Sequence, residues 1–306
     1  MTVPNIDFMR WRVLWGSISL VMVLLSVVSL STRGLNLGLD FTGGTLVEVE
    51  FPEAVNPEQV RTALVEAGFQ NGVVQYFGTE QDLLIRMPPQ SDADQANMGD
   101  QILATLELVF PGVEMRQSNF VGPAVGEELT EDAGLALLAA LFVIMLYILF
   151  RFTKQFSAGA VVALIHDVIV TLGIFSFFHW TFDLSVLAAL LAVIGYSLND
   201  TIVVSDRIRE NFRKVRRGTP IEIINQSMNQ TLVRTLVTSL TTLFVLLALL
   251  VAGGESIRGF ASALTIGIVV GTYSSIFVAA SLLVFMNIQR EDLLVPERER
   301  LEEGRP

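Results

Sequence analysis

The chain has 306 residues, of which 52% are hydrophobic and 17% are charged. An average soluble domain carries about 25% charged residues, so this composition argues against a soluble globular protein. The apolar residues come in long blocks, which is typical of membrane-spanning helices. Cysteine is absent and there are two histidines. Disulfides, thiolate zinc sites and iron–sulfur clusters are therefore excluded, and we expect no metal site.

Six apolar segments are predicted to cross the membrane, each close to the ~20 residues that a spanning helix needs. They lie at 13–30, 134–150, 157–178, 184–204, 232–252 and 259–286. The first follows two arginines, as a signal peptide would. Its apolar stretch is longer than the ~7–15 residues of a signal-peptide core, so we expect an uncleaved helix.

Basic residues mark one side of the predicted membrane protein. They gather before the first span, between spans two and three, between spans four and five, and after span six. The positive-inside rule therefore predicts that residues 1–12, the basic loop 205–231 and the tail 287–306 are cytoplasmic. The loop could also contact anionic lipid. The segment 31–132, rich in acidic residues, is predicted to be periplasmic.

The segment 31–132 is predicted to form a small α+β domain. Strands are expected at 45–51, 73–77, 82–87 and 113–120, and helices at 56–68 and 92–109. Asn56 is expected to cap the first helix. The order β-α-β-β-α-β is that of ferredoxin-like folds, which names no function by itself. Glu48, Glu50 and Glu53 are interpreted as the solvated face of an edge strand rather than as a cation site.

Ionisable residues inside predicted spans are the strongest functional signal, because a charge there costs about 2.5–3.5 kcal/mol on insertion scales and usually marks a pathway. From the ~1.5 Å rise per helical residue, Asp200 is predicted roughly 9 Å and Arg234 roughly 12 Å from the membrane midplane, on the cytoplasmic side. At these depths the two side chains can meet. Asp167 falls nearer the midplane.

Two interpretations of Asp200 and Arg234 stay open. In one they are a static pair joining two helices, although desolvation often outweighs the attraction in buried pairs. In the other Asp200 is a proton carrier, since low dielectric favours the neutral carboxyl group and a nearby arginine favours the ionised one. Asp167 is either a second proton-binding residue on the same path or a helix-packing residue. His166 lies beside it in the sequence and could also serve a relay. Polar neighbours that could order water are Tyr196, Ser197, Asn199 and Thr201.

Two glycine patterns have simpler interpretations. Gly267 and Gly271 form a GxxxG pattern, which indicates close approach between helices. The glycine-rich stretch 38–44 lacks the GxxxxGK[ST] pattern of a phosphate-binding loop. With no nucleotide motif in the chain, energy for any work has to come from a gradient or from a partner.

Four sequence motifs, in order along residues 35–286, carry a family resemblance. The first includes Asp40, Phe41, Thr42, Gly43 and Gly44, within Leu37–Thr45. The second, Val121–Gly126, includes Gly122, Pro123 and Gly126. The third and fourth are Ala163–Asp167 and Ile194–Val204. Together they resemble the SecD/SecF family of protein-export membrane proteins, which is related to the RND transporters.

The resemblance implies an RND-like half that pairs with SecD beside the SecYEG channel, often with YajC, in the bacterial inner membrane. It implies that the proton motive force completes export of unfolded preproteins after the SecA-dependent step. The family's membrane carboxylate and its partner arginine correspond to Asp200 and Arg234. We expect no enzymatic activity, no cofactor and no nucleic-acid partner.

Two other functions remain as alternatives. An RND-type half-transporter for small molecules would usually carry two much larger outer domains, and a domain of about a hundred residues is small for enclosing a ligand route. A non-transporting scaffold should tolerate Asp200→Asn. The residues do not decide between protons and sodium ions, nor whether the outer domain contacts substrate or SecD.

Overall fold

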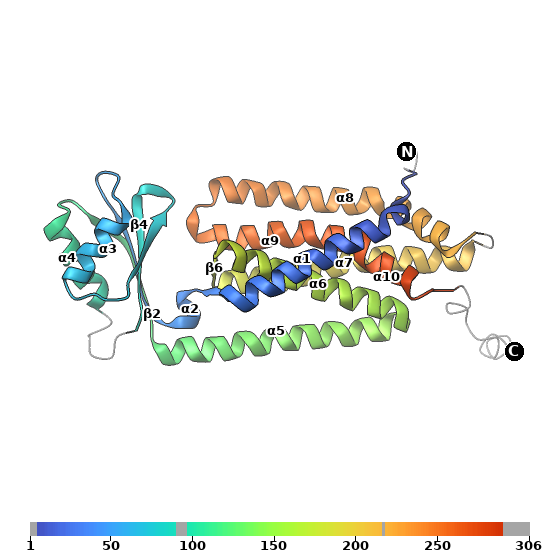
Figure 1. The fold of residues 1–306 in the computed structure, drawn as a ribbon, viewed down its shortest axis with the longest axis horizontal. Helices are drawn as coiled ribbons and strands as arrows, with labels where there is room; N and C mark the ends of the chain where they lie inside the picture. Colours follow the sequence, from blue (N-terminus) through green and yellow to red (C-terminus); the bar gives the residue numbers. More distant parts are fainter. Residues whose placement is uncertain (1–4, 90–96, 216–217, 290–306) are drawn as a thin grey trace, which may run out of the picture.

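The protein is a bundle of helices with a small α+β domain at one end (Figure 1). The computed structural model describes residues 5–89, 97–215 and 218–289. Six helical segments of this described part are long and apolar enough to cross a membrane. They comprise α1 (Arg12–Arg33) with the preceding 3-10 helix η1 (Phe8–Trp11), α5 (Pro123–Arg151), α6 (Lys154–Phe178), α7 (Leu184–Lys214), α8 (Pro220–Ala252) and α9 (Glu255–Ser274), which continues through the π-helix η3 (Ser275–Ala279) into α10 (Ala280–Phe285).

The helices extend beyond the apolar spans that hydropathy predicts, because polar residues continue the backbone hydrogen bonding past the hydrocarbon core. Much of the predicted loop 205–231 is helical: α7 runs to Lys214 and α8 begins at Pro220. Thr219 and Glu222 form a capping box at the start of α8, a local signal that fixes a helix start independently of hydropathy.

The small domain consists of β2 (Gly44–Glu50), α3 (Pro57–Glu66), β3 (Val73–Phe77), β4 (Thr79–Met87), α4 (Met98–Val109) and β5 (Glu114–Val121). Its antiparallel sheet has the strand order β3-β4-β2-β5. This confirms the predicted ferredoxin-like order and, with the six helices, the fold class. Residues 92–96 of the predicted second helix lie outside the described residues.

One prediction about the sheet is wrong. Glu48 and Glu50 lie on β2, which is a central strand between β4 and β5 rather than an edge strand. In this order the first crossover leaves room for one strand between β2 and β3, which β4 fills, and the second crossover places β5 on the other side of β2, so the first strand ends up inside the sheet. Glu50 pairs there with Arg116 of the neighbouring strand β5.

Alternating side chains of the sheet build the core of the domain. Val47 and Val49 of β2 and Ile85 of β4 are fully buried, and they pack against α3 and α4 in one apolar cluster. The Asn56 side chain accepts a hydrogen bond from the Glu58 backbone N–H and caps α3. Figure 1 shows α3 and α4 on the side of the sheet away from the bundle, so the other face of the sheet is turned toward the helices.

Candidate functional site

Three helices form the buried centre of the bundle. The apolar stretches of α6, α7 and α9 are about half buried, whereas those of α1, α5 and α8 are mostly exposed. Small residues allow the close approach of α7 and α9. Gly267 lies against Val193, and a Cβ atom on Gly271 would lie 2.9 Å from the Ser197 Cβ. The GxxxG pattern therefore serves helix packing, as predicted.

The contact at Gly267 gives a testable consequence for packing. A Gly267→Ala change would drive its methyl group into the side chain of Val193, and β-branched valine has little freedom to move away. We expect a loss of about 1–3 kcal/mol in the free energy of unfolding, measured as thermal denaturation of the purified chain in detergent. Gly195→Ala is the matched control, because nothing lies within 4 Å of its Cβ position. Equal melting temperatures for the two variants would contradict this account.

Asp167 lies at the centre of the three buried helices and is completely shielded from solvent. Its Oδ1 lies 3.0 Å from His166 Nδ1. Its Oδ2 accepts hydrogen bonds from Ser197 Oγ of α7 at 2.5 Å and from Ser274 Oγ of α9 at 2.8 Å. We refer to His166, Asp167, Ser197 and Ser274 as the Asp167 cluster; it connects α6, α7 and α9 through one carboxyl group.

Asp200 lies one helical turn beyond Ser197 on α7 and is 4% exposed. Unlike the Asp167 carboxyl group, it is incompletely bonded: its Oδ2 has no hydrogen-bond partner among the described residues. Its neighbours on α8 are Ser239 and the positive charge of Arg234. Asp200 is therefore a buried carboxyl group with a free acceptor.

Asp200 and Arg234 do not form the direct pair that their matching depths suggest. Asp200 takes part in none of the ion pairs found within 4.0 Å between described residues. Arg234 lies on the exposed face of α8, whereas Asp200 points into the bundle. Depth along a helix follows from the rise per residue, but the direction of a side chain depends on how the helix is rotated in the bundle.

The other predicted polar residues of α7 divide by the face they occupy. Ser197 and Thr201 are buried. Asn199 is exposed and points away from Asp200, because residues one apart on a helix are about 100° apart. The hydroxyl group of Tyr196 is buried without a hydrogen-bond partner in the described chain.

Ser274 is a cluster member that the sequence predictions missed. It follows Gly267 and Gly271 at the spacing that keeps residues on one helix face, so the small-residue pattern extends to it. The π-helix η3 begins at the next residue, Ser275. Single turns of π-helix interrupt α-helices rarely and are frequent at functional sites.

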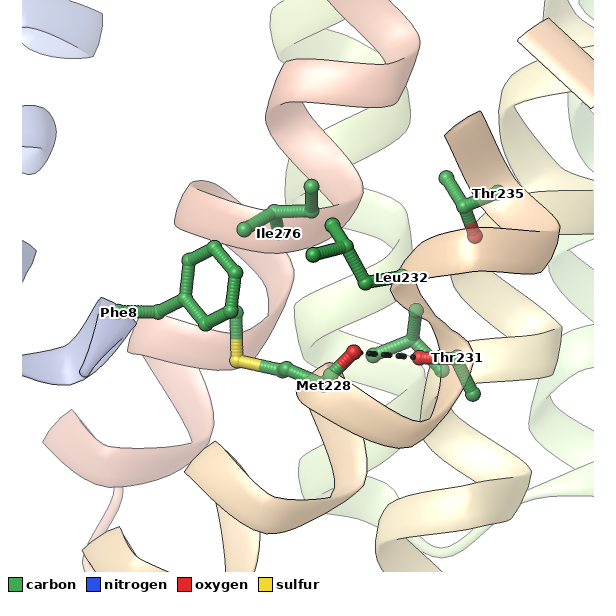
Figure 2. Close-up of a pocket in the computed structure, with 7 residues that line it drawn as sticks. Phe8, Met228, Thr231, Leu232, Thr235 and Ile276 are labelled. Carbon is green, nitrogen blue, oxygen red and sulfur yellow. Dashed lines mark hydrogen bonds between the residues drawn. The ribbon is translucent and has the colours of Figure 1, made fainter. Parts of the chain in front are cut away.

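A small cavity lies one helical turn beyond Asp200, between η1, α7, α8 and η3 (Figure 2). Its volume is about 10 Å³, roughly the least that admits one water molecule. Val204 of α7 and Thr235 of α8 are among its lining residues. The buried Thr235 hydroxyl has no hydrogen-bond partner in the described part of the chain. The cavity thus places an unsatisfied hydroxyl group close to the Asp200 region.

The two glycine-containing motifs join the small domain to the bundle. Phe41 and Asp40 belong to α2 (Leu39–Thr42). The Asp40 carboxylate accepts a hydrogen bond of 3.0 Å from the Leu184 backbone N–H at the start of α7. A Cβ atom on Gly126 of α5 would lie 2.9 Å from the Gly43 backbone nitrogen, so this contact requires glycine.

The remaining motif residues shape the same junction. Gly43 and Gly44 have φ of +66° and +116°, conformations that glycine adopts without strain. Thr42 donates a hydrogen bond to the Gly38 carbonyl at 3.1 Å. Gly122 precedes α5, and Pro123 occupies its first turn, where proline is favoured. The short strands β1 (Asn36–Leu37) and β6 (Thr181–Phe182) pair in parallel beside these residues.

A cleft of about 1210 Å³ separates the open face of the sheet from the helix ends beneath it. Tyr76 and Arg86 from the sheet and Trp180 from the bundle are among its lining residues. Gly78 in the turn between β3 and β4 lies near Glu255 at the start of α9, since a Cβ atom added to Gly78 would lie 3.4 Å from Glu255 Cγ.

Most of the charged side chains that line the cleft form hydrogen bonds or ion pairs within the protein. Burial, with a further contribution from Asp82, raises the pKa of Glu48 above its usual value. Arg86 donates hydrogen bonds to the Leu37 carbonyl at 2.7 Å and to Asn36 Oδ1 at 3.1 Å. No group of three or more potential metal ligands occurs among the described residues.

Comparisons with known proteins agree with the motifs. Residues 101–289 match the family "Protein export membrane protein SecD/SecF, C-terminal", and residues 28–52 match the SecD/SecF GG motif. The chain is 52% identical over 297 residues to protein translocase subunit SecF of Vibrio alginolyticus, covering 97% of this chain and 94% of that protein. It is 46% identical over 296 residues to the same subunit of Escherichia coli O157:H7, covering 96% and 92% of the two chains.

Solved structures give the same relationship. SecDF from Thermus thermophilus, a translocon-associated membrane protein, superposes with a TM-score of 0.84 at 39% identity, over 93% of this chain and 39% of that chain. SecDF in a super-membrane-facing form superposes with a TM-score of 0.71 at 37% identity, over 99% and 40% of the two chains. This chain thus spans about two fifths of the SecDF chains. It belongs to the SecD/SecF family of protein-export membrane proteins, and within that family to the SecF proteins.

Proposed function

We propose that this chain is a subunit of the Sec protein-export machinery, which pairs with SecD and uses the proton motive force to drive or complete translocation of unfolded preproteins after the SecA-dependent step. The observation that carries the proposal is a buried carboxyl group, Asp200, with a free acceptor oxygen inside a six-helix membrane unit. The names of the SecF relatives supply the export context.

Asp200 carries the proton in this proposal, and Arg234 adjusts its charge state. Burial favours the neutral carboxyl group, and a nearby positive charge favours the ionised one. Movement of α8 relative to α7 would change the separation of the two side chains and so switch Asp200 between uptake and release. The cavity beside Val204 and Thr235 supports a water-assisted route from Asp200 toward the basic end of the bundle.

The exposed face of α8 favours contact with a partner protein in the membrane. Arg234 lies there among exposed apolar side chains such as Val233 and Val237. A charged side chain facing lipid is costly, and intramembrane charges almost always face protein or a water-filled cavity. In our proposal SecD covers this face. Contacts with SecYEG and YajC, and cooperation with SecA, follow from the family alone.

The proposed orientation in the bacterial inner membrane follows from the basic residues. The start of α1, the end of α7 and the end of α10 lie at the end of the bundle opposite the small domain (Figure 1). Arg10, Arg207 and Lys214 lie toward this end. The positive-inside rule therefore supports cytoplasmic termini and a periplasmic small domain.

The test is preprotein translocation into inverted inner-membrane vesicles. Vesicles that contain this chain together with SecD are compared with vesicles that lack both, with and without a proton gradient. We expect the gradient to accelerate the late stage of translocation only when the two chains are present. Equal acceleration in both kinds of vesicle would exclude the proposed function.

A further inference from the structure

The Asp167 cluster combines three features that are not found together elsewhere in the described chain. Its carboxyl group is fully buried, accepts hydrogen bonds from residues of two other helices, and lies beside a π-helix. Asp200 shares the burial but has an oxygen without a partner. The two aspartates therefore differ in the property that matters for carrying a proton, which is a free position on the carboxyl group.

Hydrogen-bond chemistry indicates the part that Asp167 plays. A carboxylate accepts hydrogen bonds and donates none, whereas a serine hydroxyl can donate one. Ser197 and Ser274 both donate to Oδ2, and His166 can donate to Oδ1 through Nδ1. Both oxygens are then satisfied by protein groups. The arrangement suits a fixed acceptor that fastens neighbouring helices.

The residues that Asp167 holds lie next to the proposed coupling site. Ser197 precedes Asp200 by three residues on α7, so fixing Ser197 fixes the rotation and height of Asp200. Ser274 is the last residue of α9 before η3. Gly271 brings the α9 backbone against Ser197, so one carboxyl group determines how α7 and α9 sit on α6.

We propose that Asp167 is a positioning residue that holds α7 and α9 in the register that presents Asp200 to α8, and that it is not a second proton carrier. His166 completes the cluster by occupying Oδ1. The effect of this positioning on export, measured below, rests on the proposed function. The positioning itself concerns only the packing of this chain, and it can be measured without any export assay.

The first measurement is a distance between α7 and α9. The chain has no native cysteine, so Asn199→Cys and Val269→Cys, both at exposed positions, can carry spin labels in the full chain in lipid with SecD. We expect Asp167→Ala, Ser197→Ala and Ser274→Ala each to shift or broaden the distance distribution. Asp200→Asn should leave it unchanged. Ser281→Ala is a matched control, because the Ser281 hydroxyl has no partner among the described residues.

The second measurement is the acceleration of vesicle export by a proton gradient. We expect Ser197→Ala and Ser274→Ala each to reduce it by up to about tenfold, the effect of losing one hydrogen bond. Export without a gradient should stay at the wild-type rate, which a general loss of folding would not allow. Adding Ser197→Ala to Asp167→Ala should cause little further loss, because both changes break the same contact.

Two outcomes would overturn the inference. In the first, Asp167→Asn abolishes the gradient effect while the distance distribution and both serine variants stay like wild type, which is the behaviour of a proton carrier. In the second, none of the cluster variants changes either measurement. If even the wild-type chain shows no gradient effect, the proposed function fails, and the distance measurement still decides whether Asp167 positions α7 and α9.

Discussion

A chain with Asp200→Asn is expected to support export at the wild-type rate without a proton gradient and to lose the acceleration that a gradient provides. Asparagine keeps the size and polarity of the side chain but cannot take up and release a proton. Since Asp200 Oδ2 has no partner in the described chain, the change breaks no bond on that side. The measurement is translocation into inverted vesicles, with assembly with SecD checked by co-purification.

Asp206→Asn is the matched control for Asp200→Asn. Asp206 lies on the same helix but is partly exposed and pairs with Arg151 at 2.7 Å. Such surface pairs contribute about 0–1 kcal/mol, so the control should respond to the gradient like wild type. A normal gradient response in Asp200→Asn would contradict the carrier assignment and would favour the scaffold alternative, in which Asp200 packs helices.

The largest effect on stability is expected from Leu106→Ala in the small domain. Leu106 of α4 is fully buried in the domain core. Truncating a buried leucine removes apolar contacts and leaves a cavity, which costs about 2–5 kcal/mol. Because a domain of this size has little stability to spare, we expect rapid cleavage by added protease within residues 36–121 of the purified protein.

Leu108→Ala provides the control on the same helix. Leu108 is 86% exposed, so the same truncation removes little buried surface, and cleavage should proceed at the wild-type rate. If the two variants were cleaved equally fast, the assignment of the two faces of α4 would be wrong.

The elements of the small domain could be predicted because their signals are local. Alternating apolar residues in β2 and β4, and the Asn56 cap before Pro57, are visible within a few residues of sequence. The central position of β2 was missed because strand order depends on crossovers between distant segments. The apolar spans were likewise visible, but the helix ends were not, because α7 continues through polar residues to Lys214.

The candidate site was predictable in composition and only partly in geometry. Asp167, Asp200 and Arg234 stand out because charged residues are rare in apolar segments. Their partners depend on how each helix is rotated about its axis, and hydropathy carries little information on that. Arg234 consequently lies on an exposed face rather than against Asp200. Ser274 was missed because serine is common in these helices and its role appears only when α9 meets α6.

The small domain and the segment 36–43 that leads into it contact the bundle at places of different strength, and this difference restricts how the domain can rotate. The β1–β6 pair contributes backbone hydrogen bonds, and the Gly43–Gly126 contact is a close backbone approach. Across the cleft, Gly78 only lies near Glu255, and no hydrogen bond or ion pair between described residues joins the two. The softest motion of the domain is therefore a tilt about the first two contacts that separates Gly78 from Glu255. Such a tilt would widen the cleft along one edge while leaving the covalent path from β5 into α5 intact.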